Sequence, residues 1–425
     1  MTSKLRRAVR QTPLLRGLPK EVAVLAAIAF CVALGFGILA PAIPVFARTF
    51  EVSALQASAV ISVFALMRFI TSPLSGTLVD RLGERTILST GLAIVALSSL
   101  LAGFSQNYVE LLFLRGIGGL GSSMFTVSSM ALLLRVVEQS QRGRASGAFQ
   151  GGFLLGGVAG PAVGGIVVAW SIRAPFFVYA VTLIAATIVA LTFLTKARLQ
   201  QREHEVAKGD EKRLEPLKAA LKLPAYRAAL AVNAVSGFVV FGLRASIVPL
   251  FVTEGLQRAT SWVGWGFLIA AGIQAVLLLP AGRLADTRGR RPALLLGTIG
   301  TLLGMTLLTI SDFTSNTFGL ASMIGLAFFL VAMVAQGAAA AFLGSAPSAV
   351  VGDIMGGKKG GIVVAAYQMI SDLGAVIGPL FAGLLVDAFD FEWAFAVGAG
   401  LSVIAVLMVF AMPETLKRVS ARPAT

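Results

Sequence analysis

The stretch GTLVDRLGER at residues 76–85 recurs 206 residues later as GRLADTRGRR at residues 282–291. A long apolar segment precedes each copy, and another follows it. Two further motifs repeat in the same order along the chain, GxxAxxxPxF at residues 37–46 and 242–251, and GxxxGP at residues 156–161 and 374–379. The sequence therefore predicts two related halves, each with the same order of apolar segments.

The composition excludes most other classes of protein. Of the 425 residues, 57% are hydrophobic and only 13% are charged, about half the charged share of a typical globular protein. The mean hydropathy is +0.87. These values exclude a disordered chain. A single cysteine, Cys31, and a single histidine exclude a disulfide scaffold and leave no ordinary zinc site. The class that remains is a polytopic membrane protein.

The apolar segments are long enough to cross a bilayer as helices of ~20 residues. The first of them is too long for the core of a cleaved signal peptide. The predicted spans, numbered 1 to 12 in chain order, are residues 22–46, 54–79, 86–104, 109–134, 145–170, 175–195, 225–252, 261–285, 292–311, 318–350, 361–386 and 393–412.

The basic residues indicate how the chain is oriented. Lys and Arg cluster in the two termini and in every second connection, while the other connections hold only Arg48, Arg173 and Arg258. Because cytoplasmic connections are enriched in Lys and Arg, we expect both termini to lie in the cytoplasm, with the chain in the cell (inner) membrane. The same distribution accounts for the net charge of +15 without nucleic-acid binding.

One long polar connection, residues 196–224, separates an N-terminal six-helix half, residues 1–195, from a C-terminal six-helix half, residues 225–425. It contains His204, which is either a pH sensor or an ordinary residue of a solvated linker. The predicted fold class is an all-α membrane protein with twelve transmembrane helices in two pseudo-symmetric halves. Such a repeat suits an alternating-access transporter with its substrate path between the halves.

The repeated loop motif resembles the cytoplasmic signature of the major facilitator superfamily. Further motifs are similar to those of its twelve-span drug:proton antiporter branch, namely LGx5PAIP from Leu34 in span 1 and Lx3Rx3GxG from Leu111 in span 4. A third motif, in span 5 from Gly147 to Gly165, fits the antiporter motif of this branch throughout. The resemblance implies the major facilitator fold and, through this span 5 motif, export. Two positions depart from the branch, because Gly118 replaces the usual Gln and Gly37 stands where an acidic residue is common. The span 5 antiporter motif consists of Gly147, Gly156, Gly160, Pro161, Gly164 and Gly165.

The span 5 motif has a physical interpretation of its own. Glycines at four- and nine-residue spacings share one helix face, which lets another helix backbone approach closely. Pro161 removes one helical hydrogen bond and can bend the helix. The motif is therefore either a tight packing surface or a surface on which the halves slide, and the two interpretations are compatible.

The loop signatures also predict a cytoplasmic gate. In the superfamily span 2 lies beside span 11 and span 8 beside span 5, so Asp80 and Asp286 would each face a helix N-terminus. A carboxylate there gains about 0.3–1 kcal/mol when exposed, and up to ~2 kcal/mol when partly buried. These contacts would hold the cytoplasmic side shut; the alternative is that the charges only set the topology. The candidate gate residues are Asp80, Arg81, Gly83, Arg85, Asp286 and Arg290.

Ionisable residues within the spans are few, and such residues are functional candidates because charge inside a membrane is costly. Arg68 and Asp372 both lie ~17 Å from the cytoplasmic ends of their helices, at 1.5 Å per residue. We therefore expect them to pair across the halves, either as a functional pair or as a static pair that fixes the helix register. The predicted proton-coupling residues are Asp372, Arg68 and Arg115. The predicted substrate cavity is formed by Arg68, Arg115, Arg244, Gln368 and Asp372.

Three arginines against one aspartate predict an electropositive cavity, which favours neutral or anionic amphiphiles over polycations. The predicted function is proton-coupled efflux of such molecules by a monomer in the lipid bilayer, with small molecules and protons as its partners. The alternatives are an exporter or flippase of an anionic metabolite or lipid, and an importer on the same scaffold. The sequence has no phosphate-binding loop or nucleophile motif, so we expect no enzyme activity, cofactor, metal or catalytic residue.

Overall fold

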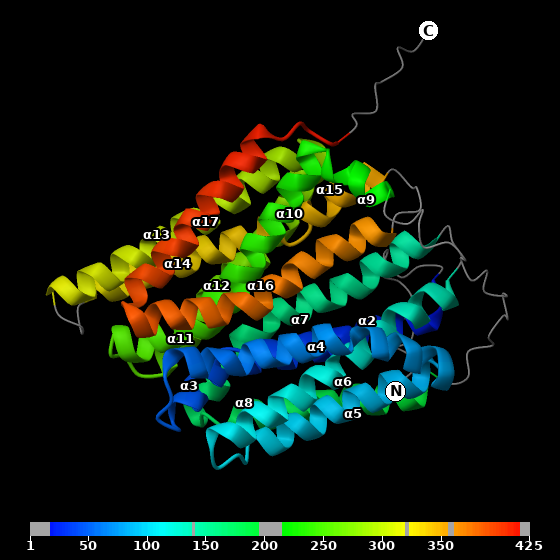
Figure 1. Cartoon of the computed structure of the whole chain (residues 1–425), viewed down its shortest axis with the longest axis horizontal. Helices are drawn as coiled ribbons and strands as arrows, with labels where there is room; N and C mark the ends of the chain where they lie inside the picture. Colours follow the sequence, from blue (N-terminus) through cyan, green and yellow to red (C-terminus); the bar gives the residue numbers. More distant parts are fainter. Residues whose placement is uncertain (1–17, 138–140, 195–214, 319–322, 356–360, 417–425) are drawn as a thin grey trace, which may run out of the picture. The chain divides into compact units, whose positions relative to one another are not determined.

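The computed structural model of the chain describes residues 18–137, 141–194, 215–318, 323–355 and 361–416 (Figure 1). All regular elements in these ranges are helices. The helices are α2 (Lys20–Leu39), α3 (Ala42–Arg48), α4 (Ala54–Leu82), α5 (Glu84–Ala102), α6 (Tyr108–Val136), α7 (Arg142–Trp170), α8 (Ala174–Phe193), α9 (Glu215–Leu221), α10 (Pro224–Gly237), η3 (Phe238–Ile247), α11 (Val248–Leu250), η4 (Phe251–Gly255), α12 (Ser261–Thr287), α13 (Arg290–Phe318), α14 (Met323–Leu343), α15 (Ala346–Met355), α16 (Gly361–Ala388) and α17 (Phe391–Ala411).

Every predicted apolar segment contains helix, so the all-α prediction is confirmed. Span 1 comprises α2 and α3, span 7 runs from α10 to η4, and span 10 comprises α14 and α15. Each of the other spans is a single helix. Within the described residues, 11 helical segments are long and apolar enough to cross a membrane. Span 5 is α7, which has 29 residues.

Three spans that the sequence predicts as continuous helices are interrupted. Span 1 breaks after Leu39, where Pro41 supplies no backbone N–H for a helical hydrogen bond. Span 10 breaks at a turn between Leu343 and Ala346. Span 7 changes to a π-helix over Phe238–Ile247. These interruptions give three spans a place to bend that the apolar pattern does not reveal.

Span 9 is longer than predicted, because α13 continues to Phe318 through the polar sequence SDFTSNT. The hydroxyl groups of this segment bond to carbonyls one turn earlier, Thr314 to Ile310 at 2.8 Å and Ser315 to Ser311 at 2.8 Å. Since these polar groups are satisfied within the helix, the polar segment remains helical. Asp312 is consequently a buried residue inside a span.

The chain forms two compact units. Unit 1 contains the described residues of Met1–Glu205 together with Arg244–Leu268 and Pro379–Ala388. Unit 2 contains the described residues of Val206–Leu243, Ile269–Gly378 and Phe389–Thr425. Spans 7, 8 and 11 therefore each contribute one part to unit 1 and the other part to unit 2.

In unit 1, α2 packs against α7 and α8, while α6 packs against α4 and α5 (Figure 1). In unit 2, α13 packs against α14 and α17, and α10 packs against α15 and α17. The core of unit 2 contains Tyr226, Val232 and Val409. The Tyr226 hydroxyl donates a hydrogen bond of 2.7 Å to the Val363 carbonyl at the start of α16.

One pair of close approaches shows that the two halves are built alike. A Cβ atom on Gly119 of span 4 would lie 2.3 Å from the Phe64 carbonyl oxygen of span 2. A Cβ atom on Gly337 of span 10 would lie 2.3 Å from the Ala270 carbonyl oxygen of span 8. Equivalent positions are 205 residues apart in spans 1 and 7, 206 apart in spans 2 and 8, and 218 apart in spans 4 and 10. These offsets identify equivalent positions in the two halves.

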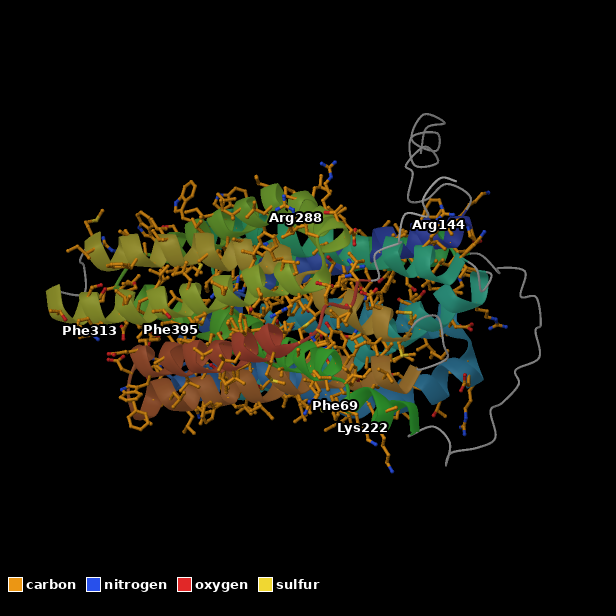
Figure 2. All side chains as sticks on the ribbon, turned by 90° about the horizontal axis from the view of Figure 1, so that it is seen from above. Phe69, Arg144, Lys222, Arg288, Phe313 and Phe395 are labelled. Atoms are coloured by element: carbon orange, nitrogen blue, oxygen red, sulfur yellow. The ribbon has the colours of Figure 1, made fainter. Side chains whose placement is uncertain are left out.

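Large apolar side chains face away from the packed helices. Phe313 on α13 is 56% exposed and points outward, whereas Phe395 on α17 is fully buried within unit 2 (Figure 2). Other exposed apolar side chains include Phe113, Trp170 and Leu279. Exposed apolar surface of this extent suits contact with lipid.

Candidate functional site

Each signature loop supplies one residue of an ion pair, an acid in the first half and a base in the second. In unit 1, Arg135 at the end of α6 donates two hydrogen bonds to Glu84, at 2.8 and 2.9 Å. In unit 2, Arg290 donates to Asp353 at the end of α15, at 3.1 Å. Glu84 and Arg290 occupy the same position of the signature, and Arg135 and Asp353 are 218 residues apart. Each half therefore has the same ion pair with its acid and its base exchanged.

The last arginine of each signature contacts the end of another span. Arg85 donates to the Leu191 carbonyl in the last turn of α8, and Arg291 donates to the Phe410 carbonyl in the last turn of α17, both at 2.5 Å. Cations at a helix C-terminus satisfy carbonyls that have no partner in the helix. The sequence analysis assigned Arg85 to the gate, and the structure places it as a cap that fastens span 3 to span 6.

Unit 2 has a further acidic residue at its signature loop, Glu414, which the sequence analysis missed. Its carboxylate accepts backbone hydrogen bonds from Arg290 at 2.8 Å and Arg291 at 3.0 Å, at the start of α13. Burial by itself would raise the pKa of Glu414, but the backbone N–H groups of Leu416, Arg290, Arg291 and Thr415 outweigh it and hold the pKa below its ordinary value.

The glycine of the second signature makes room for this carboxylate. Gly289 has a φ of +130°, and a Cβ atom on it would lie 2.2 Å from Glu414 Oε2. Any other residue would be strained and would also displace the carboxylate. The equivalent Gly83 also has a positive φ of +82°, but a Cβ atom on it would have no neighbouring atom within 4 Å, so there only the backbone conformation requires glycine.

The predicted gate aspartates are both exposed, and Asp286 forms an ion pair of 2.5 Å with Arg290 in its own unit. Arg81 is exposed as well. Asp80 belongs to unit 1 and the start of α16 to unit 2, while Asp286 belongs to unit 2 and the start of α7 to unit 1. The expected contacts of the two aspartates with helix N-termini therefore stay predictions. Gly360, which the sequence places beside the start of span 11, lies outside the described residues.

Arg115 is buried in unit 1, with 1% of its surface exposed. Its guanidinium carbon lies 4.3 Å from the centroid of the Phe64 ring, a distance suited to a cation–π interaction. Its Nε and Nη1 have no hydrogen-bond partner among the described residues. The equivalent positions in the other half hold Met333 and Ala270. The repeated framework therefore does not require an arginine and an aromatic ring here.

The other embedded charges also occur in one half only. Arg244 lies in the π-helical part of span 7, with its guanidinium carbon 5.4 Å from the centroid of the Phe267 ring. Arg68 is half-buried in unit 1, and Asp372 is half-buried in unit 2, so their pairing stays a prediction. Gln368 is exposed one turn before Asp372 on α16. The positions equivalent to Arg68, Arg244 and Asp372 hold Gln274, Leu39 and Leu154.

A buried hydroxyl cluster joins spans 2 and 4, and the sequence analysis did not identify it. The Ser123 hydroxyl lies 2.8 Å from that of Thr71 and 2.7 Å from that of Ser75. The equivalent positions in the other half hold Leu277, Ala281 and Ala341. Spacing of four residues between Thr71 and Ser75 was the available signal, but serine and threonine are too common in helices for it to stand out.

The span 5 motif packs against span 1 within unit 1. Cβ atoms on Gly156 and Gly160 would lie 2.4 Å and 2.6 Å from backbone carbonyl oxygens of α2, and one on Gly164 would lie 2.9 Å from the Ile38 Cα. Pro161 is buried in the same interface. Gly147 has no atom within 4 Å of a Cβ position. Gly165 lies on α7 with them, and the motif thus provides tight packing over most of its length.

Twelve apolar spans in two related halves, with a few buried charges found in one half only, define a secondary membrane transporter rather than an enzyme. The family model of the Major Facilitator Superfamily matches residues 25–273 and 230–424, and the chain belongs to this superfamily. It is a multi-pass integral membrane protein.

Several known proteins are similar to the chain in sequence. The chain is 25% identical over 390 residues to "Multidrug resistance protein 2" of Bacillus subtilis (strain 168), covering 88% of this chain and 92% of the relative. It is 28% identical over 335 residues to the human "Synaptic vesicular amine transporter", covering 77% of this chain and 61% of the relative. Drug-efflux proteins are thus among its homologues.

Solved structures show the same fold. A bacterial homologue of the human lysosomal transporter Spinster, inward-facing and unoccupied, aligns with a TM-score of 0.70 at 15% identity, covering 94% of this chain and 97% of the other. A D-xylose–proton symporter aligns with a TM-score of 0.69 at 19% identity, covering 93% and 98%. At these identities the likeness concerns the fold alone.

Proposed function

We propose that the chain is a proton-coupled exporter of amphipathic small molecules, neutral or anionic, which works by alternating access. The observation that supports coupling is the position of Asp372, the only carboxylate in the middle third of a span within the described residues. The equivalent position in the other half holds Leu154. A mid-span carboxylate that the framework does not need is a natural proton carrier.

In this proposal Arg68 controls the charge of Asp372. A carboxylate keeps its negative charge beside a guanidinium and takes up a proton more readily when the guanidinium moves away. Arg115 supplies a second positive charge to the cavity, held over the Phe64 ring. Proton uptake on one side and release on the other would then accompany substrate movement in the opposite direction.

The charge balance of the spans supports the substrate class. Arg68, Arg115 and Arg244 outnumber Asp372, and the other buried carboxylate, Asp312, is bonded to the Glu392 N–H at the start of α17, so the balance favours neutral or anionic amphiphiles. The same balance favours the second candidate function, an exporter or flippase of an anionic metabolite or lipid. An amine, which the name of the vesicular relatives suggests for those proteins, would meet three arginines here.

The remaining parts of the proposal concern topology and gating. Both termini lie in the cytoplasm, the chain is a monomer in the inner membrane, and Asp80 and Asp286 close the cytoplasmic side by contacting helix N-termini. Cysteine labelling tests the orientation. Arg173→Cys should react with an impermeant reagent in intact cells and Arg202→Cys only after permeabilisation; the reverse pattern would contradict it.

Transport in proteoliposomes tests the coupling. Three fluorescent amphiphiles, one neutral, one anionic and one cationic, are followed with and without an imposed proton gradient. We expect Asp372→Asn to abolish uphill transport of the neutral and anionic probes while exchange without a gradient continues. Glu110→Gln, at the exposed start of α6, is the matched acid-to-amide control. Uphill transport by Asp372→Asn would exclude this residue as the coupling site, and preference for the cationic probe would exclude the substrate class.

A further inference from the structure

The start of span 2 is capped by a residue of span 11. At the N-terminus of α4, the Asp387 carboxylate accepts hydrogen bonds from the backbone N–H groups of Ala54 and Leu55, both at 2.8 Å. The helix's own cap, Ser53, accepts only from the Gln56 N–H, at 3.3 Å. Two of the first N–H groups of α4 therefore depend on a carboxylate from the end of α16.

The backbone of α16 also lies directly against this helix start. A Cβ atom on Gly383, one turn before Asp387, would lie 2.7 Å from the Leu55 Cα and 2.8 Å from the Ala54 carbonyl oxygen. The absence of a side chain at this position lets the carboxylate reach the N–H groups. The contact thus has two independent parts, one electrostatic and one steric.

A bidentate ion pair joins spans 1 and 7 at the same end of the spans. Arg48 at the end of α3 donates to Glu254 in η4 through Nε at 2.7 Å and Nη2 at 2.6 Å. Paired bonds of this kind are among the stronger interactions between side chains. We call the end of the spans opposite the signature loops the distal end.

These contacts occur once, although the fold is repeated. The positions equivalent to Arg48 and Glu254 hold Thr253 and Thr49, and the position equivalent to Asp387 holds Ala169. The distal parts of spans 7 and 11, Arg244–Leu268 and Pro379–Ala388, belong to unit 1, while the preceding parts of the same spans belong to unit 2.

Spans 7 and 11 each pass from one unit to the other where the regular α-helical hydrogen bonding is interrupted. Span 7 does so inside the π-helix Phe238–Ile247, and span 11 does so at Pro379, which lacks a backbone N–H. Such points allow the distal segments to tilt relative to the rest of their helices.

We infer that Asp387, Gly383, Arg48 and Glu254 form a distal latch, which keeps the distal side of the transport path closed and must separate before that side opens. The distal latch rests on alternating access, but on neither proton coupling nor the identity of the substrate. Opening separates the carboxylate from the N–H groups of α4 and divides the Arg48–Glu254 pair, while the Ser53 cap remains on α4.

Spin-label distances across the distal end test this inference in the full-length protein, without a substrate. Labels at Gln106→Cys and Asn316→Cys, both exposed, are introduced after Cys31→Ser. We expect Asp387→Asn to raise the ratio of long to short distances about two- to fivefold, the size expected when an exposed carboxylate is lost from a helix N-terminus. Gly383→Ala should shift the ratio in the same direction, because its Cβ atom would press on the α4 backbone.

Ser53→Ala is the matched control, because it removes the local cap of the same helix and leaves the span 11 contact in place. It should leave the distance ratio as in the wild type. If Ser53→Ala shifts the ratio as much as Asp387→Asn, fraying of α4 explains the effect and the latch is excluded. If Asp387→Asn and Gly383→Ala both fold and keep the wild-type ratio, the latch is excluded as well. The distances across the distal end do not depend on the coupling residue. The latch can therefore be tested whether or not Asp372→Asn abolishes uphill transport.

Discussion

Exchanging the charges of the Glu84–Arg135 pair tests whether the signature loop braces its half through this contact. Glu84→Arg alone loses a partly exposed ion pair, in which the side chains are 14% and 37% exposed. Such a pair contributes roughly 0.2–1 kcal/mol. The new arginine also faces Arg135 and removes an acid from the first turn of α5, where it contributes about 0.3–1 kcal/mol. We expect a total loss of about 1–2 kcal/mol in the free energy of unfolding.

Adding Arg135→Glu should restore the pair in the polarity that the other half uses. Unit 2 already has Arg290 at the signature position and Asp353 at the end of span 10. Recovery should be incomplete by about 0.3–1 kcal/mol, because unit 2 compensates for a basic residue at the start of α13 with the Glu414 carboxylate. No described residue of unit 1 accepts from the N–H groups at the start of α5 in that way.

Reversible denaturant unfolding in detergent micelles, read as a double-mutant cycle, measures the coupling. A coupling free energy of about 0.5–1.5 kcal/mol is expected between Glu84→Arg and Arg135→Glu. The control pairs Arg135→Glu with Glu110→Arg, whose site lies at the opposite end of α6 and should show no coupling. A double variant that is no more stable than Glu84→Arg would refute the brace.

Three more predictions follow from the geometry of the two halves. Glu414→Gln should be less stable than the wild type at neutral pH, and the two proteins should become equally stable in acid. The reason is that the pKa of Glu414 is lowered in the folded state. Its contribution to stability is therefore present above the ordinary pKa and is lost as pH falls through the folded pKa. Melting temperatures between neutral pH and about pH 3.5 check this, and parallel curves would contradict it. Gly119→Ala and Gly337→Ala should each cost about 1–3 kcal/mol by overpacking, unlike Gly147→Ala, which has open space; equal yields and melting temperatures of all three would contradict the close approaches. Phe64→Leu should lower the free energy of unfolding by about 1–2 kcal/mol by removing the aromatic face beside a buried guanidinium, and a Phe64→Tyr variant should retain most of it; identical losses in the two variants would argue against the cation–π contact.

The spans and their repeat could be predicted from the sequence because each depends on local pattern. A run of apolar residues fixes a helix in a membrane, since every backbone polar group must be bonded within the helix. The glycines at 119 and 337 appear at matching places because the same backbone contact forms in both halves. The end of span 9 could not be predicted in this way, because SDFTSNT reads as a polar loop and its hydroxyls bond back to the helix.

The partners of the charged residues at span ends could not be predicted. Asp353, Asp387 and Glu414 look like ordinary charges that border a membrane segment, and their roles depend on which helix N-terminus or arginine lies beside them. The π-helix of span 7 gave no signal either, because its residues suit an ordinary helix. Tertiary packing decides both features, and a single sequence contains no direct record of it.

The departure at Gly118 gains a physical explanation when the two halves are compared. The usual glutamine is present at the equivalent position of span 10, as Gln336, where its amide lies against Gly304. In span 4 the facing residue is Ser98, and a Cβ atom on Gly118 would lie 2.8 Å from its Oγ and 3.3 Å from the Phe64 ring. A glutamine at 118 would therefore displace the ring that contacts the Arg115 guanidinium. The glycine at 118 leaves room for the Phe64 ring. The buried Arg115 guanidinium therefore faces an aromatic ring rather than a glutamine amide.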